Sequence, residues 1–149
     1  MHNKDARSYV LITPCRDEAN YIEGTLKAVT AQTVLPQKWV IVSDGSVDGT
    51  EEIVERYAAK YDFIQLLRRD GDQQRNFGSK VRAFALGYEY VKGLNFDFIG
   101  SLDADITMEP TYYEGILSKF EENERLGIEG GVRYDLYNGQ FRKVHAARN

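Results

Sequence analysis

The feature that most constrains the fold is the alternation of short apolar runs with longer segments of helical periodicity. Four runs rich in β-branched and aromatic residues have the length of buried strands, and they occupy residues 9–13, 39–42, 63–67 and 96–102. Strands that alternate with helices in this way form parallel sheets through right-handed crossovers, with helices on both faces. The pattern therefore predicts an α/β fold with a mostly parallel sheet.

The segments between these runs carry apolar residues at helical spacing. One helix is predicted through Ile22, Leu26 and Val29, with Asp17 or Asn20 as its N-cap. Further helices are predicted around residues 53–57, over residues 81–91 and over residues 111–123. Residues 68–80 are expected to form a polar loop, and residues 126–137 a final strand or hairpin with Asn138-Gly139 as its turn.

Two carboxylates follow the strand predicted at residues 96–102, at the point where it ends. In extended backbone, side chains two positions apart point to the same side, so Asp103 and Asp105 are expected to face one way. Two neighbouring carboxylates repel each other, and oxygen ligands suit Mg²⁺ or Mn²⁺. The pair therefore predicts a divalent metal site, although an isolated Asp-x-Asp is also common as a solvated acidic turn.

Ligands of open α/β sheets bind beyond the carboxyl ends of the strands, where the strand order reverses. With a strand order of 3-2-1-4, the loops after the first, second and fourth strands would meet in one crevice. Those loops carry Thr13, Pro14, Asp44, Asp103 and Asp105. Three carboxylates at one edge favour a metal-bound phosphate ligand, and the segment after the third strand offers cations at Arg68, Arg69, Arg75 and Lys80.

Charge and cysteine content exclude several classes of protein. The formal net charge of -4 argues against nucleic acid as the main partner, because proteins that bind phosphate backbones carry a basic surplus. Cys15 is the only cysteine, and without a flanking base it is interpreted as a small, partly buried residue. No apolar run reaches the length of a membrane span, and the first eight residues contain no signal-peptide core. We expect a cytoplasmic protein, with membrane association of a longer form left open.

Three motifs together resemble a known family. They are residues 10–18 (VLITPCRDE), residues 42–50 (VSDGSVDGT) and Asp103-Ala104-Asp105. In this order, and each at the end of a predicted strand, they resemble a family 2 glycosyltransferase with the GT-A fold over about the first 130 residues. The resemblance implies a single nucleotide-sugar-binding domain over residues 1–149, truncated on its acceptor side, with strand order 3-2-1-4.

The resemblance also implies roles for individual residues. The donor would be a UDP- or GDP-linked sugar, bound by Thr13, Pro14, Arg16, Glu18, Asp44, Arg75, Lys80, Asp103 and Ala104. Asp44 would accept hydrogen bonds from the nucleobase, and Lys80 and Arg75 would lie near the sugar and diphosphate. Asp103 would contact hydroxyls of the ribose or sugar, and Asp105, with Asp103 as a second metal residue, would hold Mn²⁺ or Mg²⁺ against the diphosphate. The sugar would pass, with inversion, to a hydroxyl of a carbohydrate or lipid-linked acceptor.

Two departures from the family pattern affect this interpretation. Ser43 stands where many members carry a second aspartate. The family's acceptor-side motifs, which include the catalytic base, lie beyond the end of this chain. Glu129 and Asp135 are the only late acids considered for that role, and neither sits in a recognisable motif. The catalytic base is therefore unassigned, and we expect the chain to bind donor but to transfer poorly or not at all.

Other functions remain as alternatives. Residues 103–107 (DADIT) fit the signature of haloacid-dehalogenase-type phosphatases, with Asp103 as nucleophile, although that motif usually follows the first strand. Asp44, Asp48 and Glu55 have EF-hand spacing, but a strand rather than a helix precedes them. A nucleotide-sugar-binding module without catalysis is the third alternative. The phosphate-binding glycine motifs of P-loop and dinucleotide-binding proteins are absent from the sequence.

Overall fold

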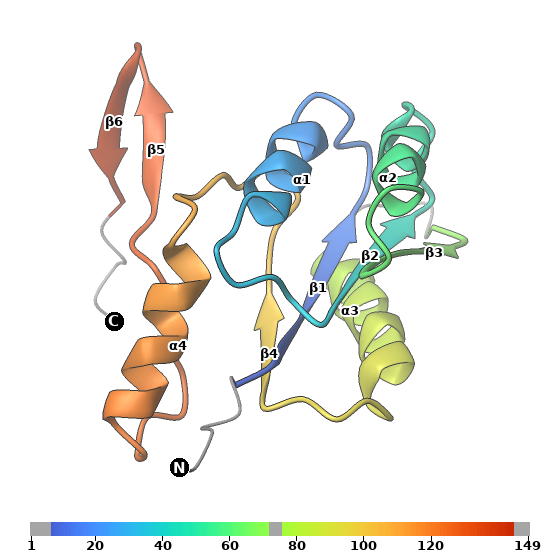
Figure 1. The fold of residues 1–149 in the computed structure, drawn as a ribbon. Helices are drawn as coiled ribbons and strands as arrows, with labels where there is room; N and C mark the ends of the chain where they lie inside the picture. The colour runs from blue at the N-terminus through green and yellow to red at the C-terminus, as the bar shows by residue number, and fades with distance from the viewer. Residues whose placement is uncertain (1–6, 72–75, 145–149) are drawn as a thin grey trace.

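The sheet that organises the molecule has four parallel strands with helices packed on both faces (Figure 1). The structure is a computed structural model that describes residues 7–71 and 76–144. Its elements are, in chain order, β1 (Tyr9–Cys15), α1 (Ile22–Thr30), β2 (Lys38–Asp44), α2 (Thr50–Ala58), β3 (Ile64–Arg69), α3 (Phe77–Val91), β4 (Phe98–Ser101), α4 (Tyr112–Glu122), β5 (Tyr134–Tyr137) and β6 (Gln140–Lys143).

The strand order is β3-β2-β1-β4, which confirms the predicted order. β1 lies between β2 and β4, so that Leu11 is in register with Trp39 on one side and with Gly100 on the other. All three pairings in this sheet are parallel. The carboxyl ends of β1, β2 and β4 therefore lie along one edge.

Each face of the sheet has its own core, because side chains of a strand alternate between the faces. Leu11 packs with residues of α1, α2 and α4, whereas Val10 and Ile12 pack with α3. The prediction of helices on both faces is confirmed. Gly87 allows α3 to pack closely, because a Cβ there would lie 2.6 Å from Ile12 Cγ2 and 3.3 Å from Val42 Cγ2.

Two predicted helix starts are wrong. α3 begins at Phe77 rather than at residue 81, because the Asn76 side chain caps it by accepting a 2.9 Å hydrogen bond from the Ser79 N–H. Lys80 consequently stands on the first turn of a helix and not in a loop. The N-cap of α1 is Tyr21, which makes no side-chain capping bond, and neither Asp17 nor Asn20 caps this helix.

The predicted hairpin is formed by β5 and β6, the last two elements of the described residues. Asn138 and Gly139 form its turn with φ values of 48° and 76°. Positive φ at both central residues suits the twist of a two-residue hairpin. The strands of the hairpin lie later in the chain than predicted, and Figure 1 shows the hairpin beyond α4, away from the four-stranded sheet. Across the described residues, no helix is long and apolar enough to cross a membrane.

Four hydrogen bonds fasten the loop after β1 to the loop after β2 and to the first residue of α2. They join Asp17 N to Ser46 Oγ (3.1 Å), Val47 N to Asp17 Oδ1 (2.8 Å), Glu18 N to Thr50 Oγ1 (2.9 Å) and Ala19 N to Asp48 Oδ2 (3.0 Å). Asp17 has φ 54°, which is uncommon for a residue other than glycine. The engagement of its carboxylate with Val47 explains why Asp17 does not cap α1. The two loops form one unit that fixes Arg16 and Glu18.

Asp48 is the acidic centre of this unit. Its carboxylate accepts hydrogen bonds from the Ala19 N–H, the Thr50 N–H and the Thr50 hydroxyl. Partial burial raises the pKa of the Asp48 carboxyl, but these hydrogen bonds favour the charged form and hold the pKa below its usual value overall. The ionised form of Asp48 therefore stabilises the two loops.

We predict that Gly87→Ala destabilises the protein. The added methyl group would collide with Ile12, and overpacking of this kind costs about 1–3 kcal/mol in the free energy of unfolding. Gly115→Ala is the matched control, because Gly115 lies in α4 with nothing within 4 Å of the added Cβ and should gain about 0.5–1 kcal/mol. Urea denaturation measures both; a Gly87→Ala midpoint at or above that of wild type would contradict the packing of α3.

We predict that Asp48 contributes to acid sensitivity. Because its pKa is lowered by folding, the stabilisation is complete above the pKa of an unfolded aspartate, about 3.9, and is lost as the pH falls through the lower folded value. Asp48→Asn keeps an oxygen acceptor but does not titrate there. Its free energy of unfolding should be lower than that of wild type at pH 7 and should decline less between pH 5 and pH 3. Parallel declines of the two proteins would refute this role.

Candidate functional site

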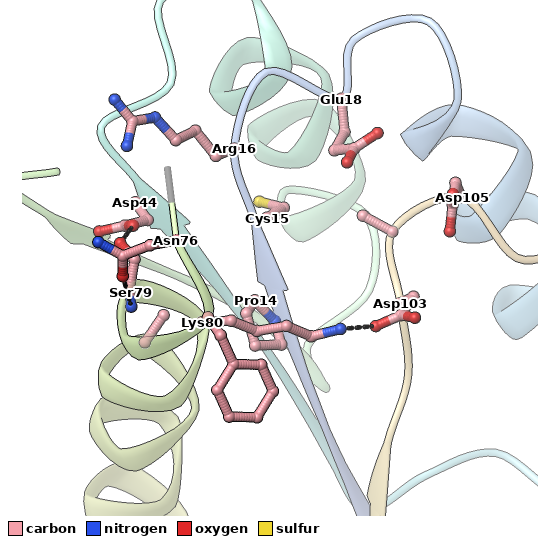
Figure 2. Close-up of a pocket in the computed structure, with 13 residues that line it drawn as sticks. Pro14, Cys15, Arg16, Glu18, Asp44, Asn76, Ser79, Lys80, Asp103 and Asp105 are labelled. Carbon is pink, nitrogen blue, oxygen red and sulfur yellow. Dashed lines mark hydrogen bonds and ion pairs between the residues drawn. The ribbon is translucent and has the colours of Figure 1, made fainter. Parts of the chain in front are cut away.

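A pocket of about 500 Å³ opens at the carboxyl ends of β1, β2 and β4 (Figure 2). This volume is typical of small-molecule sites. Its lining comes from the end of β1 and the loop after it, the end of β2, the start of α3 and the loop after β4. The lining residues are Pro14, Cys15, Arg16, Glu18, Asp44, Asn76, Phe77, Ser79, Lys80, Ala83, Asp103, Ala104 and Asp105.

The structure brings most of the sequence-predicted site residues together in this pocket. Those residues are Pro14, Arg16, Glu18, Asp44, Lys80, Asp103, Ala104 and Asp105. Thr13 does not reach the pocket: it is fully buried, and its hydroxyl accepts a 2.9 Å hydrogen bond from the Trp39 indole N–H. The Thr13 side chain therefore packs in the core and does not make the expected contact with the base and ribose. Arg75 lies outside the described residues.

The start of α3 contributes residues that the sequence analysis missed. Asn76, Phe77, Ser79 and Ala83 line the pocket together with the expected Lys80. A signal was present, because asparagine is a favoured N-cap residue and Asn76 stands directly before the apolar Phe77. The polar character of residues 68–80 concealed it. Phe77 is 81% exposed, which is unusual for so large an apolar side chain beside a pocket.

Asp44 is held by two partners. The residue is only 4% exposed, and its carboxylate accepts hydrogen bonds from the Arg69 guanidinium and the Ser79 hydroxyl. Arg69 is the register partner of Asp44 on β3, so the sheet itself places the counter-charge. A buried carboxylate requires such pairing. The position and orientation of Asp44 are thus fixed without a ligand.

Arg68 does not belong to the site, although it was counted among the cations available to a ligand. Its guanidinium pairs with Glu51 at 2.6 Å and also with Glu55, both on α2. Glu51 in turn accepts a 2.7 Å hydrogen bond from the hydroxyl of Ser43, where many family members have an aspartate. Ser43 is therefore part of the packing between β2 and α2.

Asp103 and Lys80 join the two walls of the pocket. The Lys80 Nζ lies 2.6 Å from Asp103 Oδ1, and Figure 2 shows this ion pair reaching from α3 to the loop after β4. Both side chains are about half exposed, at 50% and 52%. Lys80 is therefore the counter-charge of Asp103, just as Arg69 is the counter-charge of Asp44.

The expectation that extended backbone aligns Asp103 with Asp105 is wrong. β4 ends at Ser101, and Ala104 and Asp105 form a turn. The turn is fixed because the Ala104 carbonyl accepts a 2.8 Å hydrogen bond from the Thr25 hydroxyl of α1. Asp105 is exposed at the pocket, and within the described residues its carboxylate has neither an ion pair nor a hydrogen bond.

The side chains at this edge of the sheet supply only some of the ligands that a divalent metal ion needs. The described residues form no group of three or more histidine, cysteine, aspartate or glutamate side chains that could hold a metal. Two aspartates are available, at Asp105 and Asp103. Mg²⁺ commonly binds through one or two carboxylates and completes its coordination with phosphate oxygens and water. The residues present therefore fit a metal that arrives with a phosphate ligand.

Cys15 lines the pocket but is not a nucleophile. Its burial, followed by the nearby carboxylates of Glu18, Glu51, Asp48 and Asp44, raises the pKa of the thiol to about 12. The thiol is consequently neutral at physiological pH, and it is the thiolate that reacts and binds metals. The EF-hand spacing is also without function, because Asp44 pairs with Arg69 and Glu55 pairs with Arg68.

Comparison with solved structures shows the GT-A fold. Staphylococcus aureus TarS (residues 1–349, in complex with UDP) superimposes with a TM-score of 0.65 at 21% identity, over 78% of this chain and 33% of that chain. The mannosyltransferase PcManGT from Pyrobaculum calidifontis, in complex with GDP-Man and Mn²⁺, gives a TM-score of 0.62 at 19% identity, over 75% and 32% of the two chains.

Curated relatives agree with this fold. The poly-β-1,6-N-acetyl-D-glucosamine synthase of Staphylococcus aureus (strain MSSA476) is 31% identical over 119 residues, which are 78% of this chain and 26% of that protein. Glycosyltransferase AglE of Haloferax volcanii is 30% identical over 131 residues, or 87% and 40% of the two chains. The chain thus spans well under half of either relative. The family described as glycosyl transferase family 2 matches residues 10–147, and the chain belongs to this family.

Proposed function

We propose that the pocket binds a nucleoside diphosphate sugar together with Mn²⁺ or Mg²⁺, as the donor site of an inverting glycosyltransferase. The observation that carries the proposal is that acids from two separate strand ends, Asp44 and the Asp103/Asp105 pair, line one pocket with Lys80. Acids at two separate strand ends, with a lysine that reaches across the pocket, suit a ligand with a hydrogen-bonding base at one end and a metal-bound diphosphate at the other.

Asp44 is assigned to the nucleobase. Each carboxylate oxygen can accept more than one hydrogen bond, so Asp44 can receive a base N–H while keeping Arg69 and Ser79. Uracil and guanine both present such an N–H, which leaves the nucleotide open. The solved relatives divide in the same way, since TarS structures contain UDP or UDP-GlcNAc and the PcManGT structure contains GDP-Man.

Asp105 and Asp103 are assigned to the metal and Lys80 to the diphosphate. Asp105 is the exposed carboxylate of the pocket for which the described residues provide no counter-charge. The bound metal would supply Lewis acidity to the departing nucleoside diphosphate. Lys80 would bring positive charge to the same phosphates from the first turn of α3.

The acceptor end of the reaction is assigned only by class. A carbohydrate or lipid-linked hydroxyl is the proposed acceptor, and a general base must lie within reach of it. Glu129 and Asp135 are not proposed for that role, because neither lines the pocket: Glu129 pairs with Lys119 at 2.8 Å and Asp135 with Arg133 at 3.1 Å. We therefore propose donor binding by this chain without assigning the base.

We predict that UDP or GDP binds in a metal-dependent way. In calorimetric titrations, Mn²⁺ should strengthen the binding of the preferred nucleotide, and Asp105→Asn should weaken binding in Mn²⁺ by at least about tenfold, or ~1.4 kcal/mol. Asp44→Ala should weaken binding both with and without Mn²⁺, because it removes the base acceptor and leaves the metal ligands.

The matched control for both variants is Asp62→Asn. Asp62 is an exposed aspartate that precedes β3, so it lies at the opposite edge of the parallel sheet. The Asp62→Asn protein should bind nucleotide with the affinity of wild type. Binding that ignores Mn²⁺, or an Asp105→Asn protein that binds as tightly as the control, would contradict the assignment.

A further inference from the structure

The two acid–base pairs of the pocket differ in how firmly they are held. Asp44 is buried and has two partners, Arg69 and Ser79, so its contacts are not readily exchanged. Among the described residues, Asp103 has one partner, the Lys80 ammonium at 2.6 Å, and both side chains are about half exposed. Exposed ion pairs contribute little net stability, because water solvates each ion almost as well as its partner does. The Lys80–Asp103 pair can therefore open at small cost.

Lys80 holds the carboxylate that the proposed function assigns to the metal. An ammonium group on Asp103 Oδ1 occupies one ligand position and also repels a divalent ion at that edge of the pocket. A metal ion arriving alone must therefore displace Lys80 or bind beside a positive charge. The pocket should bind a bare divalent ion weakly for this reason.

A diphosphate competes with Asp103 for the Lys80 ammonium. It brings several negative oxygens into the pocket, and lysine presents three donors on a flexible four-carbon stem. The ammonium can then exchange Asp103 for phosphate oxygens without a change of backbone, which leaves the Asp103 carboxylate to the metal. Asp105 lies at the same pocket and would hold the metal throughout.

We propose that Lys80 is a positioning residue that couples metal binding to nucleotide binding by occupying Asp103 until a diphosphate draws it away. This inference rests on the proposed donor site. Linkage makes the coupling reciprocal: the factor by which nucleotide raises metal affinity equals the factor by which metal raises nucleotide affinity. Part of that factor is assigned to the Lys80–Asp103 pair, and the remainder to direct contact between metal and diphosphate.

The test is a double-mutant cycle on Mn²⁺ binding in the absence of nucleotide. Binding is measured by electron paramagnetic resonance, which detects the Mn²⁺ that remains unbound. The proteins are wild type, Lys80→Met, Asp103→Asn and the double variant, each checked for an unchanged urea midpoint. Lys92→Met is the matched control, since Lys92 lies just after α3 and pairs with Glu89 at similar exposure, away from the pocket.

Lys80→Met should bind Mn²⁺ alone about five- to tenfold more tightly than wild type, and Lys92→Met should match wild type. The gain must vanish in the Asp103→Asn background, because the coupling acts through that carboxylate. An unchanged Mn²⁺ affinity in Lys80→Met would overturn the inference. So would a gain of the same size in the Asp103→Asn background, since that result indicates general charge repulsion and no specific pair.

A second measurement separates this inference from the proposed function. With saturating UDP or GDP, whichever binds, the nucleotide should raise the Mn²⁺ affinity of Lys80→Met by a factor at least about threefold smaller than in wild type. An equal factor in the two proteins overturns the role of Lys80 while leaving the donor site intact. A wild-type protein that shows no metal-dependent nucleotide binding overturns the donor site itself.

Discussion

The parallel pairing of β1 with both β2 and β4 is the constraint on which the site depends. It brings the carboxyl ends of these strands to one edge, where Asp44, Asp103 and Asp105 line a common pocket. Concentrating carboxylates in this way is electrostatically unfavourable unless cations compensate. The fold provides two of them, Arg69 beside Asp44 and Lys80 beside Asp103. Among the described residues, the exposed Asp105 carboxylate has no such compensating cation.

Family membership and site geometry independently support the proposed ligand, a nucleoside diphosphate sugar. The chain belongs to glycosyl transferase family 2 by its sequence, and its described pocket combines the buried acid Asp44 with the half-exposed Lys80–Asp103 ion pair that spans the pocket. The loop after β1 is fastened to the loop after β2 through Asp17 and Asp48, so the backbone around Arg16 and Glu18 is built before any ligand arrives. Preorganisation of this kind lowers the entropic cost of binding.

The sequence predicts much of the fold because its signals there are local. Alternating strands and helices predict the parallel sheet, and Asn138-Gly139 predicts the final hairpin turn. The errors arise where the cause is tertiary or hidden by composition. The Thr13 hydroxyl bonds the buried indole of Trp39 and does not reach the pocket. Arg69 rather than Arg68 pairs with Asp44, because the register of β3 places it opposite that residue. The turn at Ala104 depends on Thr25 of α1, which no spacing within residues 96–105 reveals.

The most direct test is a crystal structure of the chain grown with Mn²⁺ and its preferred nucleoside diphosphate. Anomalous scattering locates the metal without reference to any assumed role. We expect a single Mn²⁺ peak in contact with the Asp105 carboxylate and the diphosphate, with the base beside Asp44 and the Lys80 ammonium on a phosphate. Manganese away from Asp105, or a nucleotide bound outside this pocket, would contradict it.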